Sequence, residues 1–244
     1  MTDREYTRPV SGAMVGQDNS ARREGKRALV NQLSATGEGH PRTHVGDFYL
    51  GPTDAVFDVD LLRQAYEEVM QRVRPIIADR AGDSVTAVSL THRRDATDPL
   101  TDGLQSQFAP DGAMRYLESE FCCVNEALAD TYFAIVWQSV RALMPVGRMR
   151  LMIVPPRKVY RMHADATQRA HLAIRTDPEA FLVGPDGDGY HVPADGRVRV
   201  FDTRLRHTVF NAGTVDRVHL VMSVADTERP HHTALLRRAE GDSR

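Results

Sequence analysis

Short apolar runs separated by turn residues fill the chain from about residue 146 to residue 224. Segments such as 148–154, 170–174, 180–183 and 196–201 are rich in apolar residues, and Pro, Gly, Asp and Asn lie between the runs. Runs of this length are typical of β-strands, and about eight of them at close spacing are typical of an all-β sandwich or barrel. The sequence therefore predicts a mainly β core in this region.

Two segments of the first half have helical spacing instead. The first spans 59–73, ends at Pro75 and carries one apolar face, formed by Leu61, Leu62, Ala65, Val69 and Val73. The second spans 127–144, with an expected inner stripe of Leu128, Tyr132, Ile135, Val136, Ser139 and Leu143. We expect both helices to pack on the outside of the β core, with Trp137 against the sheet.

The chain divides into three parts. Residues 1–45 are rich in Gly, Ser, Arg, Asn and Thr and poor in large apolar residues, which predicts a flexible N-terminal arm. Residues 46–228 form one predicted domain, in which 46–145 elaborate a β core at 146–228. Residues 229–244 are expected to be an exposed C-terminal tail. Within the elaboration, the polar segment 91–111 is a candidate lid.

Composition narrows the functional class. The 244 residues carry a net charge of −2 with acidic and basic residues nearly balanced, which gives no electrostatic case for binding nucleic acid or membranes. No apolar run approaches the roughly 18 residues of a membrane span, and the first residues lack the apolar core of a signal peptide. The two cysteines, Cys122 and Cys123, are adjacent and exclude a disulfide framework. We expect a cytoplasmic protein.

The main chemical signal is His163-x-Asp165 together with His207. Side chains two residues apart on a strand point the same way, so His163 and Asp165 can reach one metal ion from one strand or strand end. His207 would come from another strand of the barrel. Two imidazoles and one carboxylate are the ligand set of a mononuclear non-haem Fe(II) site with an open face. Alone, His-x-Asp is also common as a solvated His before an Asp that starts a turn.

A second signal follows His207. Residues 211–214 read as the turn of a hairpin, which would place Arg217 opposite His207 on the neighbouring strand. An arginine beside a metal-binding histidine can bind a substrate carboxylate with two hydrogen bonds. The alternative is a surface arginine on an edge strand.

With these motifs in order, residues 148–224 resemble the double-stranded β-helix of Fe(II)/2-oxoglutarate-dependent oxygenases, and within them the aspartyl/asparaginyl β-hydroxylase-like group. The resemblance rests on several short motifs, namely Tyr160-Arg-Met-His163-Ala-Asp165, Arg169-Ala-His171-Leu, Val200-Phe-Asp-Thr203, His207-Thr-Val-Phe-Asn211 and Asp216-Arg217-Val-His219-Leu. It implies a mainly β fold with packed helices around a jelly-roll (cupin) core.

The resemblance also implies roles for individual residues. His163, Asp165 and His207 would hold Fe(II) and make up the catalytic centre, and Arg217 would bind the distal carboxylate of the co-substrate 2-oxoglutarate. Arg169 and His171, which share a strand face, match an Arg-x-His pair that also contacts the co-substrate; a hydrogen-bonded core histidine is the alternative for His171. The implied reaction consumes O2, decarboxylates 2-oxoglutarate to succinate, and hydroxylates the substrate through ferryl hydrogen abstraction and hydroxyl rebound.

Two features limit the transfer. Mammalian-type aspartyl hydroxylases lack the carboxylate ligand that Asp165 supplies here, which makes their peptide substrate a doubtful guide. Related halogenases replace this carboxylate with a small residue, so Asp165 favours hydroxylation of a small molecule, such as an amino acid or a natural-product intermediate. Two alternatives stay open: a metal-dependent cupin-type enzyme that does not use 2-oxoglutarate, and a non-catalytic ligand-binding barrel. Arg157, Tyr160 and Arg175 are possible pocket residues.

Overall fold

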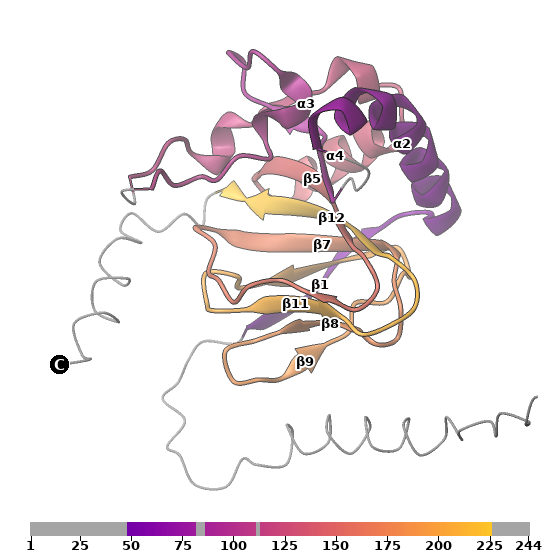
Figure 1. Cartoon of the computed structure of the whole chain (residues 1–244), viewed down its shortest axis with the longest axis vertical. Coiled ribbons are helices and arrows are strands. Elements are labelled where there is room, and N and C mark those ends of the chain that lie inside the picture. Colours follow the sequence, from indigo (N-terminus) through magenta and orange to yellow (C-terminus); the bar gives the residue numbers. More distant parts are fainter. Residues whose placement is uncertain (1–47, 82–85, 111–112, 226–244) are drawn as a thin grey trace, which may run out of the picture. The chain divides into compact units, whose positions relative to one another are not determined.

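The computed structural model describes residues 48–81, 86–110 and 113–225, and Figure 1 shows their arrangement. The predicted arm, 1–45, and the predicted tail, 229–244, lie outside the described residues. Within the described part, strands β1 to β12 are joined by helices α2, α3 and α4 and by two short 3-10 helices, η1 and η2. None of the described helices is long and apolar enough to cross a membrane.

The larger of the two main sheets has six antiparallel strands in the order β1-β10-β7-β12-β5-β2. Its strands are β1 (Tyr49–Val56), β2 (Ala87–Ser89), β5 (Val146–Val154), β7 (Gln168–Arg175), β10 (Arg197–Phe201) and β12 (Arg217–Val224). The first half of the chain thus contributes one strand to each edge of this sheet.

The smaller sheet has four antiparallel strands in the order β6-β11-β8-β9. Its strands are β6 (Lys158–Val159), β8 (Ala180–Val183), β9 (Gly189–Tyr190) and β11 (Thr208–Asn211). From β5 to β12 the chain passes back and forth between the two sheets, which is the winding of a double-stranded β-helix. The predicted jelly-roll (cupin) core is therefore confirmed. A short pair, β3 (Thr91–His92) with β4 (Cys123–Val124), lies beside it, and α3 (Pro99–Asp102) falls within the candidate lid.

Helix α2 (Val59–Ala81) begins where the carboxylate of Asp58 accepts hydrogen bonds from the backbone N–H groups of Asp60 and Leu61. Its buried face is Leu62, Ala65, Tyr66, Val69, Met70 and Val73. Leu61, expected on this face, is 42% exposed. The helix also continues past Pro75, its expected end, because a proline removes one hydrogen bond from a helix that its buried face already anchors.

Helix α4 (Tyr132–Leu143) differs more from its prediction. It starts later than expected, after η2 (Glu126–Leu128), and buries the face formed by Phe133, Val136, Trp137 and Val140. Ile135 and Leu143, which the predicted stripe contained, are more than half exposed. The predicted stripe left out Phe133, whereas the helix buries the rings of Phe133 and of Trp137, which was expected against the sheet; large aromatic rings remove much apolar surface from water.

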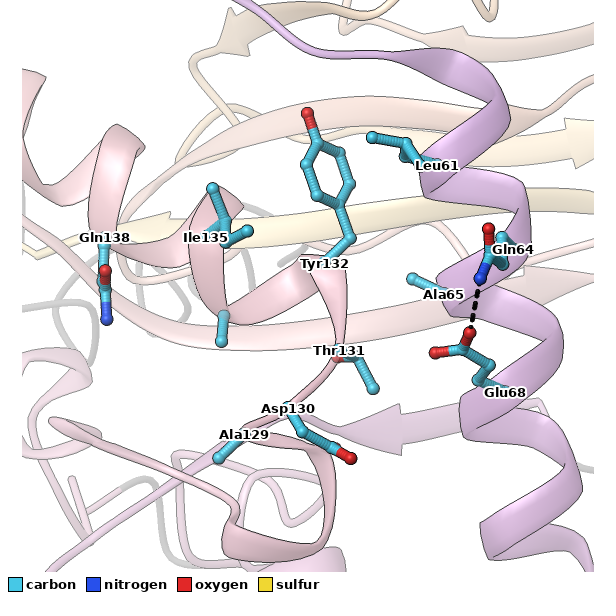
Figure 2. A pocket seen from close by; sticks show the side chains of 11 residues that line it. Leu61, Gln64, Ala65, Glu68, Ala129, Asp130, Thr131, Tyr132, Ile135 and Gln138 are labelled. Carbon is cyan, nitrogen blue, oxygen red and sulfur yellow. Dashed lines mark hydrogen bonds between the residues drawn. The ribbon is translucent and has the colours of Figure 1, made fainter.

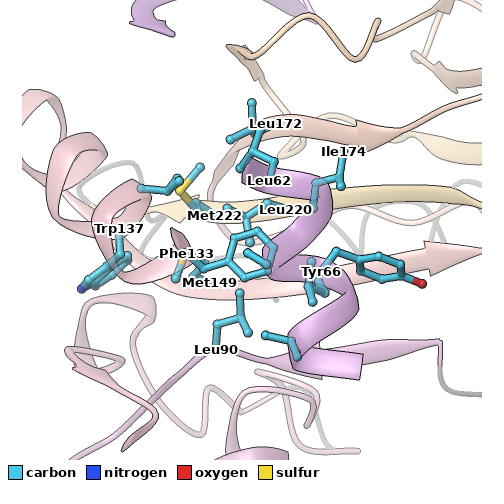
Figure 3. Packing of buried hydrophobic residues seen from close by; sticks show 14 of the residues in the cluster. Leu62, Tyr66, Leu90, Phe133, Trp137, Met149, Leu172, Ile174, Leu220 and Met222 are labelled. Atoms are coloured by element: carbon cyan, nitrogen blue, oxygen red, sulfur yellow. The ribbon is translucent and has the colours of Figure 1, made fainter. Parts of the chain in front are cut away.

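The larger sheet is buried on both faces. Its outer face packs against α2 and α4, where Leu172, Leu220 and Met222 meet residues of the helices such as Leu62 and Phe133 (Figure 3). Its inner face lines the barrel, with a smaller apolar cluster around Phe48, Leu182 and Phe201. Since side chains alternate along each strand, every second residue of β5, β7 and β12 points into the barrel. The candidate site is built from these inward residues.

Candidate metal centre

His163 and Asp165 lie on the segment between β6 and β7, and His207 lies one residue before β11. His163 and His207 face each other as an antiparallel pair whose two backbone hydrogen bonds are 2.9 and 2.8 Å long. The N–H group of Asp165 donates to the carbonyl of Thr203 at 2.8 Å. The three side chains offer ligand atoms that all lie within 4.8 Å of one another. The structure thus brings together the three predicted metal ligands.

A backbone carbonyl contacts one nitrogen of each imidazole ring. Nδ1 of His163 lies 2.9 Å from the carbonyl oxygen of Arg161, and Nδ1 of His207 lies 3.0 Å from that of Leu205. A carbonyl only accepts, so each Nδ1 carries the proton and each Nε2 keeps its lone pair. Nε2 of His207 lies 3.8 Å from Oδ2 of Asp165. Two imidazole nitrogens and a carboxylate oxygen fit Fe(II) with open coordination positions.

Arg169 of β7 fixes the Asp165 carboxylate. Its Nε donates to Asp165 Oδ2 at 3.1 Å, its Nη1 to Thr167 Oγ1 at 2.6 Å, and its Nη2 to Glu118 Oε1 at 3.0 Å. Burial opposes ionisation of Asp165, but the positive charge of Arg169 outweighs it and holds the pKa of Asp165 far below its ordinary value. All three nitrogens of the Arg169 guanidinium therefore have protein partners, although the resemblance assigned Arg169 to the co-substrate.

Glu118, which the sequence did not single out, is the acid at the centre of this network. It lies on η1 (Glu118–Glu120), is fully buried, and accepts hydrogen bonds from Arg148 at 2.6 Å, Arg169 at 3.0 Å and Ser223 at 2.8 Å. Burial opposes its ionisation, but the guanidinium groups of Arg169 and Arg148 together lower its pKa. Gly147 permits this approach, because a Cβ atom there would lie 1.9 Å from the Glu118 carbonyl oxygen.

A cavity of about 160 Å³ opens beside the three ligands, on the barrel side of the larger sheet. It is lined by the His-Asp-His cluster, by Arg169 and Thr203 beside it, by the basic residues Arg150, His171 and Arg217, and by Met152, Val154, Tyr160, Leu182, Val209 and Val221. Most of the wall is apolar, and it carries two guanidinium groups, those of Arg150 and Arg217, without an acid among the described residues. This composition favours an anionic ligand with a short apolar chain.

Two arginines of the cavity, Arg150 and Arg217, have no acidic partner within the described residues. Nε of Arg150 and one Nη of Arg217 are buried without a hydrogen bond there. The pKa of each guanidinium is lowered to about 9, mainly by burial; for Arg150 the charges of Arg148 and Arg169 contribute to this shift, and those of Glu118 and Asp165 oppose it. An unpaired buried charge is costly, and an anion bound in the cavity would offset that cost.

Two buried histidines lie near these arginines. His171 and His219 have ring centroids 5.7 Å apart, and both nitrogens of each ring lack a hydrogen-bond partner among the described residues. Among the described residues, His171 therefore makes no side-chain hydrogen bond of the kind expected for a hydrogen-bonded core histidine, and its role stays a prediction. Burial lowers the pKa of both rings well below the ordinary value, so both are neutral near pH 7.

The predicted hairpin between His207 and Arg217 is wrong, although both residues line the cavity. β11 pairs with β6 and β8, whereas β12 pairs with β5 and β7 in the other sheet. The intervening segment is a crossover, which Asn211 holds through hydrogen bonds to the carbonyls of Val154 and Val215. Turn residues look the same in a crossover as in a hairpin, so the sequence could not distinguish the two.

Of the three possible pocket residues, only Tyr160 lines the cavity. Arg175 donates to Glu67 of α2 at 3.1 Å, and Arg157 is exposed in a left-handed conformation with φ of 59°.

A second hollow, of about 410 Å³, lies between α2 and α4 (Figure 2). Its polar groups are occupied, since Glu68 accepts from Gln64 at 2.8 Å and Asp130 pairs with Arg72. It contains no histidine or cysteine, and we assign it no chemistry.

Comparison with known families supports the enzyme class. A family model described as aspartyl/asparaginyl beta-hydroxylase matches residues 119–227, a range that contains the His-Asp-His cluster and Arg217. The match confirms the resemblance seen in the motifs, and with it a 2-oxoglutarate-dependent hydroxylase as the enzyme class. No curated protein matches the chain.

Several solved structures are similar to the chain. A prolyl-4-hydroxylase from Pseudomonas putida is 17% identical with a TM-score of 0.39, covering 84% of this chain and 98% of its own. A non-heme monooxygenase, ThoJ in a nickel complex, is 13% identical with a TM-score of 0.43, covering 72% of each chain. A cupin domain from Bordetella pertussis Tohama I is 16% identical with a TM-score of 0.27, covering 32% of this chain and 79% of its own. At these scores the likenesses add nothing to what the strand order already shows.

Proposed function

We propose that this chain, whose residues 119–227 are similar to the aspartyl/asparaginyl β-hydroxylases, is an Fe(II)- and 2-oxoglutarate-dependent hydroxylase of a small molecule such as an amino acid or a natural-product intermediate. One observation carries the proposal. A single cavity joins the His-Asp-His cluster to a buried guanidinium, that of Arg217, which has no acidic partner among the described residues.

His163, Asp165 and His207 would hold the iron. Bound Fe(II), with 2-oxoglutarate and O2, supplies the oxidising power that inserts oxygen into a substrate C–H bond and leaves succinate and CO2. In the neutral rings, the carbonyls of Arg161 and Leu205 select the tautomer with the proton on Nδ1, which leaves the Nε2 lone pairs available to the metal, and Arg169 pairs with the Asp165 carboxylate. His163 is exposed whereas His207 is buried, so the substrate would approach from the His163 side.

Arg217 would bind the distal carboxylate of 2-oxoglutarate. Its planar guanidinium can form two parallel hydrogen bonds with a carboxylate, and it lies on the wall of the same cavity as the metal ligands. Val154, Val209 and Val221 supply apolar wall for the methylene groups between the two ends of the co-substrate. His171 is neutral and unpartnered, so its N–H group can donate to the same ligand.

The test is an anaerobic titration of the protein with Fe(II) and 2-oxoglutarate, followed by the visible absorbance of the ternary complex. We expect a band that requires both components, and succinate release once O2 and a substrate are added. His207→Ala should abolish the band, whereas His191→Ala, which alters an exposed histidine that does not line the cavity, should keep it.

The result also separates the alternatives. Tight Fe(II) binding without a 2-oxoglutarate-dependent band would indicate a cupin-type metal enzyme that does not use 2-oxoglutarate. Failure to bind Fe(II) at all would remove the iron assignment and leave a ligand-binding barrel.

A further inference from the structure

Arg150 is a cation of the cavity to which the proposed function gives no task. It alternates along β5 with Leu151, which packs against the helices, so its side chain points into the barrel together with Met152. Its cross-strand neighbours are Val221 on β12 and Ser89 on β2, and both are neutral. The side chain is only partly covered, since part of its surface faces the cavity.

The other arginine near the metal ligands is not free to bind a second anion. Arg169 is held by Asp165, Thr167 and Glu118. Arg150 has no acid within ion-pair distance in the part of the chain that the structure describes, and its Nε is buried without a hydrogen bond. Arg150 is therefore the cation of this cavity that remains available once Arg217 is assigned to the co-substrate.

The co-substrate cannot satisfy Arg150 as well. 2-Oxoglutarate has two carboxylates: one is needed with the keto oxygen at the metal, and the other is assigned to Arg217. A further anionic group in this cavity has to belong to the substrate. Tyr160 lines the same cavity, and its hydroxyl can donate a hydrogen bond to the same group.

We propose that Arg150 binds an anionic group of the substrate, so that the enzyme acts on small molecules with a free carboxylate and does not accept the corresponding amides. This inference rests on the proposed function. It narrows the substrate to a carboxylic acid, of which a free amino acid is one example, and it makes Arg150 a specificity-determining residue.

The experiment uses the full-length protein loaded with Fe(II) and 2-oxoglutarate without O2. The probes are the free L-amino acids and short aliphatic carboxylic acids, each compared with its carboxamide, and binding is followed by the change in the absorbance of the ternary complex. We expect at least one acid to bind at least 20-fold more tightly than its amide. Arg150→Met should lower the affinity for that acid at least 50-fold, and Arg150→Lys should lower it less because the charge is kept.

The variants carry their own controls. Arg150→Met should leave 2-oxoglutarate affinity within about threefold of wild type, and far-UV circular dichroism with the thermal midpoint should show that it is folded. Arg206→Met removes an exposed arginine next to His207 that does not line the cavity, and it should bind the acid like wild type.

Three results would overturn the inference while the proposed function survives. The first is that acids and their amides bind with equal affinity, and the second is that none of the acids binds. The third is that Arg150→Met lowers the affinity for 2-oxoglutarate as strongly as Arg217→Met does, which would make Arg150 a co-substrate ligand. The absence of any 2-oxoglutarate-dependent band in the wild-type protein would instead remove the proposed function itself.

Discussion

Two neighbouring regions of one barrel, which we call the Glu118 end and the Arg150 and Arg217 end, treat arginine in opposite ways. At one end, Arg148 and Arg169 share the buried carboxylate of Glu118. In the cavity, Arg150 and Arg217 lie on β5 and β12 without an acid among the described residues. Arg148 and Arg150 are only two residues apart on the same strand face, so the difference comes from where η1 supplies its acid and not from the strand.

The contrast separates structure from binding. A buried charge with a well-placed counter-ion closes its own site, whereas a buried charge without one destabilises the empty protein and favours an anionic ligand. The Glu118 end is therefore a structural ion-pair network, and Arg169 connects it to Asp165 of the candidate metal centre. At the Arg150 and Arg217 end, a bound anionic ligand would supply the counter-ion.

Removal of Glu118 is the largest perturbation that this comparison predicts. In Glu118→Ala, Arg148 and Arg169 stay buried without their shared acid, and breaking such a network from one side costs about 3–5 kcal/mol of unfolding free energy. Urea unfolding at 25 °C measures the loss. Glu126→Ala, at an exposed position of η2, should change stability by less than about 0.5 kcal/mol. A Glu118→Ala protein as stable as this control would show that the ion pairs of Glu118 do not stabilise the fold.

Removal of Arg217 should lower ligand affinity without lowering the stability of the empty protein. Arg217→Met keeps the volume and removes an unpaired buried charge, so we expect the unfolding free energy of the empty protein to stay equal or rise by about 1–3 kcal/mol. The affinity for 2-oxoglutarate should fall about 100-fold or more, which corresponds to at least about 2.8 kcal/mol. Anaerobic titration and urea unfolding measure the two effects. A loss of stability with unchanged 2-oxoglutarate affinity would place Arg217 among the structural arginines.

The strands, and with them the fold, could be predicted because their signal is local. Alternating apolar residues and turn clusters predicted strands close to the observed β5 to β12. The buried face of α4 could be predicted only in part: Trp137 is buried in the core as expected, whereas the outward position of Ile135 depends on the shape of the sheet beneath the helix.

The site was predictable only in part, for the same reason. His163, Asp165 and His207 are recognisable by residue type and spacing, and the structure brings them together. Arg217 lies in the same cavity, but through a crossover between sheets and not through the predicted hairpin. Glu118 and Arg150 gave no signal, because an acid in a polar segment and an arginine on an alternating strand both look solvent-exposed until the opposite layer is known.

Arg169 links the two ends, because it lines the cavity and also pairs with Glu118. Lysine keeps the charge at this position but cannot hold Asp165, Thr167 and Glu118 at once, so Arg169→Lys should loosen the Asp165 carboxylate. We expect Fe(II) affinity to fall 10- to 100-fold, about 1.4–2.8 kcal/mol, as is common when the partner of a metal ligand is removed. Competition with a chelator, without 2-oxoglutarate, measures this. If Fe(II) affinity is unchanged and only 2-oxoglutarate binding weakens, Arg169 binds the co-substrate as the resemblance implied.

Lowering the pH should reduce the stabilisation that Glu118 gives to the folded protein, gradually and by a smaller amount. The pKa of Glu118 is lowered from its ordinary 4.5, because the attraction of Arg169 and Arg148 outweighs the burial that opposes ionisation. A lowered pKa means that the unfolded chain takes up a proton first, so the stabilisation is complete above pH 4.5 and is lost as the pH falls toward the folded value. In that window each such group contributes a slope of about 1.4 kcal/mol per pH unit. Glu118→Gln should make the loss of stability below pH 4.5 shallower by up to this slope, whatever its stability at pH 7. Urea unfolding at several pH values checks it, and identical slopes for the two proteins would mean that Glu118 is not held ionised by its arginines.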